Sequence, residues 1–290
     1  MFNHLKQGKG TMSDTMHIVL SSDDNYARPL AVTIMSVLCS KAKDDSLSFH
    51  ILDGGITADN RRRLSDMVTA RNAAIEFIPI SAELFSGKTL NITSQNHVSL
   101  ATYYRLLIPA LIAADRCIYM DCDMICRTSL APLWSTPLGS DLAAAVKDID
   151  EDKQGDRLGL KRYFNAGLFL MDLEAMRREH TQEAFFRFLE EHHDRIVMHD
   201  QDVLNCVLEG RIHELDMAWN CQVAKTHKCR ETGFHALSST ANILHFIGHR
   251  KPWHWKCKSP GRAEFWKYEK EGPWKASWFV RIFKQCSSLF

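Results

Sequence analysis

The stretch RCIYMDCDMICRTSL, residues 116–130, places two aspartates directly after an apolar run. The run at 117–120 is typical of a strand buried inside a sheet, and Asp121 and Asp123 follow it at once. Alternate residues of an extended chain point to the same side. At the carboxyl edge of a parallel sheet, where open α/β sheets bind ligands, both carboxylates would face the same crevice.

Two neighbouring carboxylates repel each other unless a cation lies between them or one of them is protonated. Oxygen ligands of this kind suit a divalent ion, with Mg²⁺ or Mn²⁺ as the default. A surface turn after a strand is the alternative, since D-x-D sequences are common. A second one, DID at 148–150, continues into two more acidic residues and is typical of a solvated acidic loop.

Strand and helix patterns alternate on both sides of this stretch. The alternation predicts an α/β fold in which a mostly parallel sheet carries helices on both faces. No repeat or low-complexity linker divides the chain, so one domain at 16–255 with a C-terminal extension at 256–290 is the simplest organisation. The predicted strands are 17–22, 49–53, 74–80, 116–121, 142–146, 167–173 and 241–248, and the predicted helices are 28–41, 57–71, 99–112, 174–195 and 201–210.

The composition is that of an ordinary soluble globular chain, with 290 residues, of which 45% are hydrophobic and 24% charged. The formal net charge of +1 does not favour a nucleic-acid partner. From residue 249 onward, however, ten Lys and Arg residues stand against three Asp and Glu residues. A basic C-terminal segment on an acidic body favours an anionic surface or substrate at that end.

Nine cysteines are scattered from Cys39 to Cys286 without a C-x-x-C pair, which argues against a structural zinc site and a disulfide framework. We expect most of them to be reduced and buried, as in a cytosolic protein. The N-terminal residues 1–15 contain no apolar signal-peptide core. The best apolar run, 106–114, is too short to span a bilayer.

The motif SSDDNY (21–26) directly follows the first predicted strand, a favoured nucleotide position in doubly wound folds. Tyr26 offers a ring for stacking on a base. The alternative is a turn that caps the following helix. Neither G-x-G-x-x-G nor a P-loop is present, so phosphate binding must use other groups.

The motif YFNAGLFLMDL (163–173) predicts a tight turn at Asn165, Ala166 and Gly167 that enters a strand. Small residues there permit a ligand to approach the backbone closely. A β-bulge is the alternative.

The motif HDQDVLN (199–205) gathers Asp200, Gln201 and Asp202 at a predicted helix start. Such residues can bind a ligand. They can equally well satisfy the helix N-terminus, because carboxylates are favourable there.

The motif LHFIGHRKPWHW (244–255) ends the last predicted strand. His245 is a possible metal ligand, although a single histidine is more often structural. Gly248 and Lys251 could approach and neutralise a phosphate.

Taken in order, these motifs resemble the bacterial branch of glycosyltransferase family 8, in particular lipooligosaccharide galactosyltransferases and related lipopolysaccharide glycosyltransferases. The resemblance runs from about residue 17 to residue 253 and includes TYYRLLIP (102–109) and SLAPLW (129–134). It implies the GT-A fold, a nucleotide-diphospho-sugar transferase fold with a Rossmann-like mixed sheet flanked by helices. It also implies a hexosyltransferase that uses UDP-galactose or UDP-glucose and a glycan or lipid-linked saccharide acceptor in lipopolysaccharide biosynthesis.

The resemblance assigns a role to each motif. Asp121, Asp123 and His245 would hold Mn²⁺, or Mg²⁺, against the diphosphate of the UDP-sugar. The metal would neutralise the charge on the departing UDP. The resemblance also implies that Asp148 faces the acceptor. The other donor contacts are expected from Asp23, Asn25 and Tyr26 at uracil and ribose, from Gly248 and Lys251 at the phosphates, and from Arg105, Asp121, Asn165, Ala166, Gly167, Asp200 and Gln201 around the diphosphate and donor sugar.

The family's reaction retains the anomeric configuration, which constrains the mechanism. Double displacement needs a carboxylate nucleophile, but the group nearest the anomeric carbon resembles the amide of Gln201, a poor nucleophile. We therefore hypothesise front-face substitution with Gln201 and Asp200 as catalytic residues, in which the departing phosphate helps to deprotonate the acceptor hydroxyl. One departure from the family pattern is His249-Arg250, where relatives usually carry a proline and a small residue.

The tail WKASWFVRIFKQCSSLF (274–290) predicts a basic amphipathic helix with aromatic residues. Such a helix favours binding to an anionic membrane surface, which would place the enzyme on the inner face of the bacterial cytoplasmic membrane. The alternative is a helix packed on the body of the protein. Two other functions remain open at this point: a metal-dependent phosphohydrolase that uses the D-x-D, and a non-catalytic protein that binds a sugar nucleotide or glycan.

Overall fold

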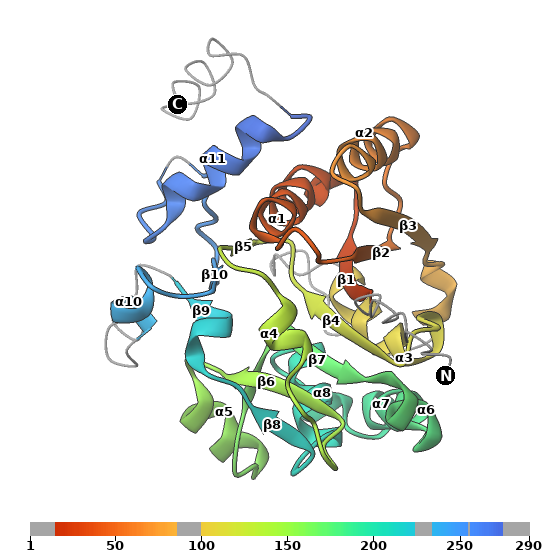
Figure 1. Cartoon of the computed structure of the whole chain (residues 1–290). Helices are drawn as coiled ribbons and strands as arrows, with labels where there is room; N and C mark the ends of the chain where they lie inside the picture. Colours follow the sequence, from red (N-terminus) through yellow and green to blue (C-terminus); the bar gives the residue numbers. More distant parts are fainter. Residues whose placement is uncertain (1–14, 86–99, 224–233, 255, 275–290) are drawn as a thin grey trace, which may run out of the picture.

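A seven-stranded mixed sheet forms the centre of the computed structural model, which describes residues 15–85, 100–223, 234–254 and 256–274 (Figure 1). Strands β1 to β4 are parallel where they pair, β7 is antiparallel to both β4 and β6, and β6 is parallel to β8. Across the sheet the order is β3 (Ala74–Pro79), β2 (Leu47–Asp53), β1 (Met16–Ser22), β4 (Arg116–Met120), β7 (Phe164–Asp172), β6 (Ala143–Lys147) and β8 (Ile212–Glu214). The α/β fold with a mixed, mostly parallel sheet is confirmed, and β7 is the one strand of this sheet that runs opposite to the others.

The central strands bury both of their faces, since alternate side chains contact two different apolar clusters. Ile18 and Ile118 belong to one cluster, and their neighbours Val19 and Tyr119 belong to the other. Strands buried on both sides are expected to be almost continuously apolar, which is why the run at 117–120 has no charged residue.

Helices cover both faces of the sheet, as predicted. Residues of α1, α2 and α11 fill the first cluster, and residues of α3, α6, α7 and α8 fill the second. Figure 1 shows these two groups on opposite sides of the strands. The helices are α1 (Ala27–Ser40), α2 (Ala58–Thr69), α3 (Ile108–Leu111), α4 (Ala131–Trp134), α5 (Glu151–Leu158), α6 (Leu173–Arg178), α7 (Thr181–Glu191), α8 (Asp200–Val207), α10 (Phe234–Leu237) and α11 (Arg262–Glu271), with 3-10 turns η1 (Asp24–Tyr26), η2 (Ala82–Phe85), η3 (Leu100–Leu107), η4 (His193–Arg195) and η5 (Met217–Asn220).

A small second sheet joins distant parts of the chain beside the end of β4. It consists of β5 (Met124–Cys126), β10 (Ile243–His245) and β9 (Cys221–Gln222), with β10 antiparallel to β5 and parallel to β9. The backbone N–H of Phe246 donates to Asp123 O at 3.0 Å. This pairing fixes His245 next to the D-x-D sequence.

The predicted turn at residues 165–167 is wrong, because these residues lie inside β7. The strand begins at Phe164 and is stabilised on one edge by Asn205, whose side chain bonds both the N–H and the carbonyl of Phe164. The register between β6 and β7 shifts between Ala145 and Lys147. A β-bulge is the alternative to a turn at residues 165–167, and a register shift of this kind is consistent with it.

Two predicted helices are interrupted. The segment predicted at 99–112 is the 3-10 helix η3 followed by the single turn α3, in which Pro109 occupies an early position where its missing N–H costs nothing. The long helix predicted at 174–195 is divided into α6 and α7 at His180, whose φ of 52° is left-handed. A left-handed residue cannot continue an α-helix.

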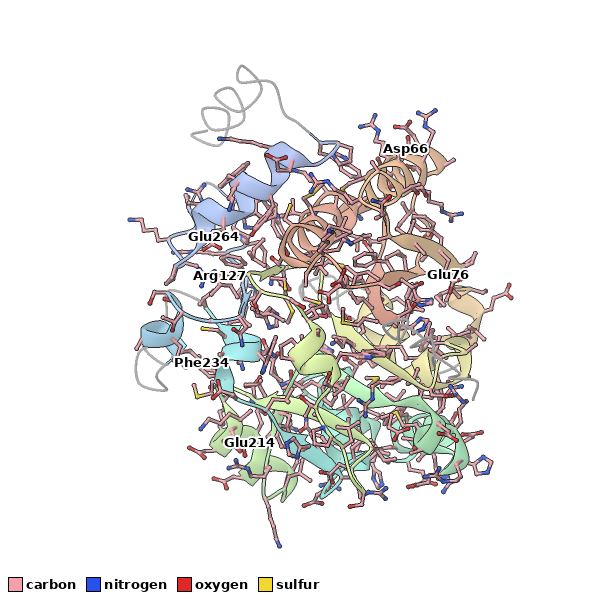
Figure 2. All side chains as sticks on the ribbon, viewed as in Figure 1. Asp66, Glu76, Arg127, Glu214, Phe234 and Glu264 are labelled. Carbon is pink, nitrogen blue, oxygen red and sulfur yellow. The ribbon has the colours of Figure 1, made fainter. Side chains whose placement is uncertain are left out.

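The start of the predicted C-terminal extension packs on the main body, where Glu269 pairs with Arg28 of α1. Arg127, after β5, pairs with Glu264 of α11 (Figure 2). The tail predicted as a membrane helix lies outside the described residues beyond residue 274. Within the described segments, no helix is both long and apolar enough to cross a bilayer. Five of the described cysteines are buried: Cys117, Cys122, Cys126, Cys221 and Cys257.

Candidate active site

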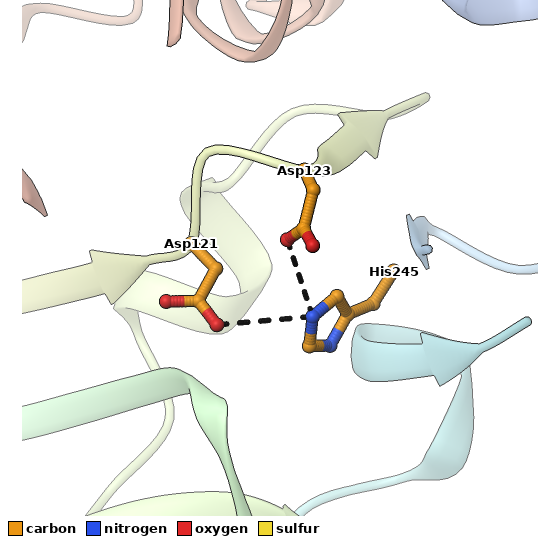
Figure 3. A group of neighbouring side chains, drawn as sticks. All are labelled: Asp121, Asp123 and His245. Atoms are coloured by element: carbon orange, nitrogen blue, oxygen red, sulfur yellow. Dashed lines mark ion pairs between the residues drawn. The ribbon is translucent and has the colours of Figure 1, made fainter. Parts of the chain in front are cut away.

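Asp121, Asp123 and His245 lie together at the carboxyl end of β4 (Figure 3). Asp121 follows the last residue of that strand, and its backbone N–H donates to Gly167 O at 2.8 Å. His245 Nε2 is 3.8 Å from Asp121 Oδ2 and 3.3 Å from Asp123 Oδ1. One potential ligand atom from each side chain lies within 4.8 Å of the others, so a single ion can reach all three.

The chemistry of this group fits a divalent cation. Asp123 Oδ1 is buried and accepts no hydrogen bond from any described residue. A buried carboxylate oxygen without a partner is costly unless a cation reaches it. Two carboxylates with one imidazole suit a first-row ion such as Mn²⁺ better than Mg²⁺, whose ligands are almost always oxygens.

Lys251 closes the other side of Asp123. Its Nζ lies 2.5 Å from Asp123 Oδ2 and donates to Phe246 O at 2.9 Å. Burial alone would raise the pKa of Asp123, but Lys251 and His245 together hold it well below its usual range. Asp123 is therefore ionised at neutral pH and ready to bind a cation.

Arg105 connects the aspartate end of the site to the start of α8. Its guanidinium is almost fully buried and lies 4.4 Å from the ring centroid of Tyr119. It donates from Nη2 to Asp121 Oδ1 at 2.9 Å and pairs through Nε with Asp200 Oδ2 at 2.8 Å. A third N–H donates to Ala166 O. One cation thus fixes two carboxylates and the β7 backbone relative to one another.

Asp200 has an unusual environment for a carboxylate. It is 2% exposed, and burial raises its pKa to about 7, against a usual value of 3.8. This value is the net result, because Arg105 opposes the effect of burial and the nearby charge of Asp121 adds to it. Perturbed groups of this kind are concentrated at functional sites.

The side chain of Gln201 is held in place by two hydrogen bonds. Its Oε1 accepts the backbone N–H of Ala166 at 2.9 Å, and its Nε2 donates to Asp148 Oδ2 at 3.2 Å. Asp148 is buried and accepts from Asn165 Nδ2 at 2.9 Å. The interpretation of residues 148–150 as a solvated loop is therefore wrong for Asp148.

Asp202 has a structural part in the same motif. Its carboxylate accepts the backbone N–H groups of Val197 and Met198 at 2.7 and 2.8 Å and also pairs with Arg157. For this residue the helix-start explanation holds, because its side chain satisfies the turn that enters α8.

Gly167 makes room for His245. A Cβ built on Gly167 would lie 2.3 Å from His245 Cε1 and 2.8 Å from Nδ1. The histidine ring therefore packs directly against the β7 backbone. The small residue permits the close approach of a side chain from β10, at the point where a ligand was expected.

A cleft of about 160 Å³ opens above the carboxyl ends of β1 and β4. Asp23 caps the turn into α1 by accepting the N–H of Tyr26, and the Tyr26 ring contacts Trp253 edge-on at 5.7 Å. Of the predicted nucleotide contacts, Asn25 is exposed and does not line the cleft. The lining residues are Ser21, Ser22, Asp23, Tyr26, Ala101, Thr102, Arg105, Tyr119, Asp121, Cys122 and Asp123.

Gly248 and Lys251 lie on the segment that leaves β10. Gly248 is exposed with a φ of +78°, a conformation that glycine adopts without strain. The resulting turn returns the chain so that Lys251 reaches Asp123. The neighbouring His249 and Arg250 are exposed.

Several functional candidates carry no recognisable sequence signal. Asn220, at the end of η5, is fully buried and contacts His245 Nδ1 through Oδ1 at 3.0 Å. Tyr119 donates its hydroxyl to Asp121 Oδ1 at 2.8 Å. Asn220 lies in a segment without a motif, and the apolar pattern around Tyr119 predicts only a buried strand.

Comparisons with known proteins identify the family and the fold of this chain. The model of the family described as Glycosyl transferase family 8 matches residues 17–257. General stress protein A of Bacillus subtilis is 30% identical, over 90% of this chain and 95% of its own length. A lipopolysaccharide glucosyltransferase of Escherichia coli is 25% identical, over 90% of this chain and 79% of its own. The crystal structure of a galactosyltransferase, LgtC, with donor and acceptor sugar analogues superposes with a TM-score of 0.79 at 28% identity, covering 92% of this chain and 99% of that one.

Proposed function

Since the chain belongs to glycosyl transferase family 8, we propose that it transfers a hexose, galactose or glucose, from a UDP-hexose to a saccharide acceptor of the lipopolysaccharide or lipooligosaccharide type. The observation that carries the proposal is the Asp121–Asp123–His245 group, with Lys251 beside it, at the end of a cleft. A nucleoside diphosphate needs both a cation site and a basic group. Here the basic group, Lys251, contacts Asp123 of the cation site.

The donor is proposed to bind along the cleft. Uracil and ribose would contact Asp23 and Tyr26, with the exposed Asn25 at the rim. The diphosphate would lie between the three metal ligands and Lys251. A Mn²⁺ ion held there would act as a Lewis acid on the diphosphate. Gly248 would place the turn backbone beside the same phosphates.

The sugar is proposed to lie between Arg105 and β7. Asp200, Gln201 and the backbone of residues 165–167 would then surround it, and Asp148 would face the acceptor side. Gln201 is held by two hydrogen bonds, so its amide is positioned without being ionised. A neutral amide is a poor nucleophile. As a fixed dipole, however, it can stabilise positive charge that develops on the sugar ring.

We infer a retaining, front-face substitution from this arrangement. The bond between the anomeric carbon and the UDP oxygen breaks, and the acceptor oxygen bonds to the same face of that carbon. The acceptor proton passes to the departing β-phosphate oxygen. Asp200 and Arg105 would hold the sugar and balance the charge during this step. Near-normal turnover in Gln201→Ala would contradict a direct role for that side chain.

UDP release from UDP-galactose and UDP-glucose tests the function, because slow hydrolysis needs no acceptor. We expect release that requires Mn²⁺, stops with chelator, prefers one sugar and is lost in Asp123→Asn. Binding of UDP-sugar without any release would favour the non-catalytic binding protein. Hydrolysis of simple phosphate esters in place of UDP-sugars would favour the phosphohydrolase.

Membrane association is a separate proposal that rests on the basic C-terminal composition. The tail at 274–290 would bind anionic lipid on the cytoplasmic face of the membrane, where a lipid-linked acceptor would be available. Removal of residues 275–290 should lower co-sedimentation with anionic vesicles while UDP release persists. Equal sedimentation of both proteins would contradict the proposal.

A further inference from the structure

A continuous chain of buried side chains runs from His245 to Asp148. His245 Nδ1 is 3.0 Å from Asn220 Oδ1, and Asn220 Nδ2 donates to Asn165 Oδ1 at 2.9 Å. Asn165 Nδ2 then donates to Asp148 Oδ2 at 2.9 Å. All four side chains are buried, and they come from β10, η5, β7 and the segment after β6.

The direction of every hydrogen bond in this chain is fixed by groups that have only one role. An ionised carboxylate only accepts, so Asp148 requires a donor from Asn165. The backbone N–H of Gly167 only donates, and it points at Asn165 Oδ1 at 3.0 Å. Flipping the Asn165 amide would therefore create one acceptor–acceptor and one donor–donor contact. The hydrogen-bond network therefore assigns the orientation of the Asn165 amide.

The orientation of Asn165 determines that of Asn220. Because Asn165 Oδ1 only accepts, Asn220 must donate to it from Nδ2. Asn220 Oδ1 must then face His245. A neutral imidazole has one N–H and one acceptor nitrogen. His245 Nδ1 must then carry the hydrogen, which leaves Nε2 as a lone-pair donor.

The freed Nε2 is the nitrogen that faces the two aspartates. It lies 3.3 Å from Asp123 Oδ1, a buried oxygen that accepts no hydrogen bond from a described residue. Two lone pairs facing each other are unfavourable unless a cation lies between them. A ring turned the other way would place a C–H against Asn220 Oδ1 and lose the bond at 3.0 Å.

We propose that Asn220 is a positioning residue that holds His245 as the Nδ1–H tautomer with Nε2 directed to the metal, and that Asp148 sets this orientation through Asn165. The metal role of His245 rests on the proposed function, whereas the tautomer does not. The same Asp148 oxygen accepts from Gln201 Nε2 at 3.2 Å. The metal end and the sugar end of the site are thus aligned by one carboxylate.

The test is the tautomer of His245, read by long-range ¹H–¹⁵N NMR on protein labelled with ¹⁵N-histidine, without metal. The measurement is made at about pH 8.5, about two units above the ordinary histidine pKa, where imidazole is neutral. His245→Gln assigns the signal. We expect the Nδ1–H pattern in the wild type and its loss in Asn220→Leu, which keeps the size of the side chain but removes the acceptor.

The second readout is Mn²⁺ affinity, obtained from the EPR signal of free Mn²⁺. Loss of a group that orients a metal-bound histidine typically costs about 10–100-fold in affinity, and we expect this loss in Asn220→Leu. Asn205→Leu is the matched control, since Asn205 is an equally buried amide that bonds Phe164 and the Gln201 carbonyl without contacting His245. It should destabilise the fold while leaving the tautomer and the Mn²⁺ affinity unchanged.

Asn220→Asp separates orientation from folding. It keeps the acceptor for His245, so the Nδ1–H tautomer and Mn²⁺ affinity should persist, while the new carboxylate opposes Asn165 Oδ1 and lowers stability. An Nε2–H tautomer in the wild type, or an unchanged tautomer in Asn220→Leu, would overturn the proposal. Equal loss of Mn²⁺ affinity in Asn220→Asp and Asn220→Leu would also overturn it. A wild type with the Nδ1–H tautomer but no Mn²⁺ binding would refute the metal role in the proposed function and leave the network standing.

Discussion

Gly167→Ala tests the close packing of His245 on β7. The added Cβ would lie 2.3 Å from His245 Cε1, whereas ordinary van der Waals contact begins at 3.4 Å, so the ring must retreat by about 1.1 Å. A misplacement of about 1 Å can cost about 100-fold in rate, and a badly oriented metal ligand about 10–100-fold in affinity. We expect Mn²⁺ affinity, measured by EPR, to fall in that range. If β7 moves instead, the overpacking should cost about 1–3 kcal/mol of stability in thermal or denaturant unfolding.

Gly272→Ala provides the matched control for this substitution. Gly272 is also buried, but its nearest contact for a Cβ is 3.6 Å and its φ is −93°, so alanine fits without strain. A second control removes the clash from the other side: in a His245→Ser background, Gly167→Ala should lose most of its destabilising effect. The coupling between the two sites is the quantity that reports their contact.

The reasoning would be refuted by a Gly167→Ala protein with wild-type Mn²⁺ affinity and wild-type stability. It would also be refuted if the stability cost were the same with and without the His245 ring. Either outcome would mean that the ring does not lie against the strand in solution.

Three further predictions concern the charged groups of the site. Arg105→Lys keeps one cation but cannot reach three acceptors at once, so kcat/KM for UDP release should fall by about 100-fold or more; a change below threefold would argue against the role of Arg105. Asp200 has a folded pKa of about 7, raised above 3.8 chiefly by burial, so the stability associated with its proton is present at low pH and is lost as pH rises through about 7. Asp200→Asn should therefore raise the melting temperature of metal-free protein more at about pH 8 than at about pH 5, and an equal shift at both would contradict that pKa. Lys251→Met removes the cation beside Asp123 and should weaken UDP binding by about tenfold or more in calorimetry, with Lys267→Met, an exposed lysine of α11, as the control.

Much of the site could be predicted because it consists of local patterns. Two carboxylates after an apolar run predict an oxygen-rich group at the edge of a sheet, and Asp121 and Asp123 lie at such an edge. The capping explanation was also correct for Asp23 and Asp202, since both accept backbone N–H groups of neighbouring residues. Capping depends on residues two to five positions away, which the sequence displays directly.

The errors arose where contacts are long-range. The turn predicted at 165–167 ignored the possibility that an antiparallel strand could insert between β4 and β6, which no local pattern reveals. Asp148 was misjudged for the same reason: its acidic neighbours are exposed or half-exposed, but its own partners, Asn165 and Gln201, come from other elements.

The sequence by itself determined the α/β class, the position of the carboxylates at a strand end and, through the ordered motifs, the family. Those properties follow from side-chain periodicity and from residue order, and both can be recognised in the sequence alone. The tertiary structure alone decided which residues meet: β10 pairs with β5 and brings His245 to Asp123, and η5 places Asn220 behind the ring. The physical reason is that a hydrogen-bond network depends on distances of about 3 Å and on donor direction. Segments far apart in the chain satisfy these conditions only after the sheets have formed.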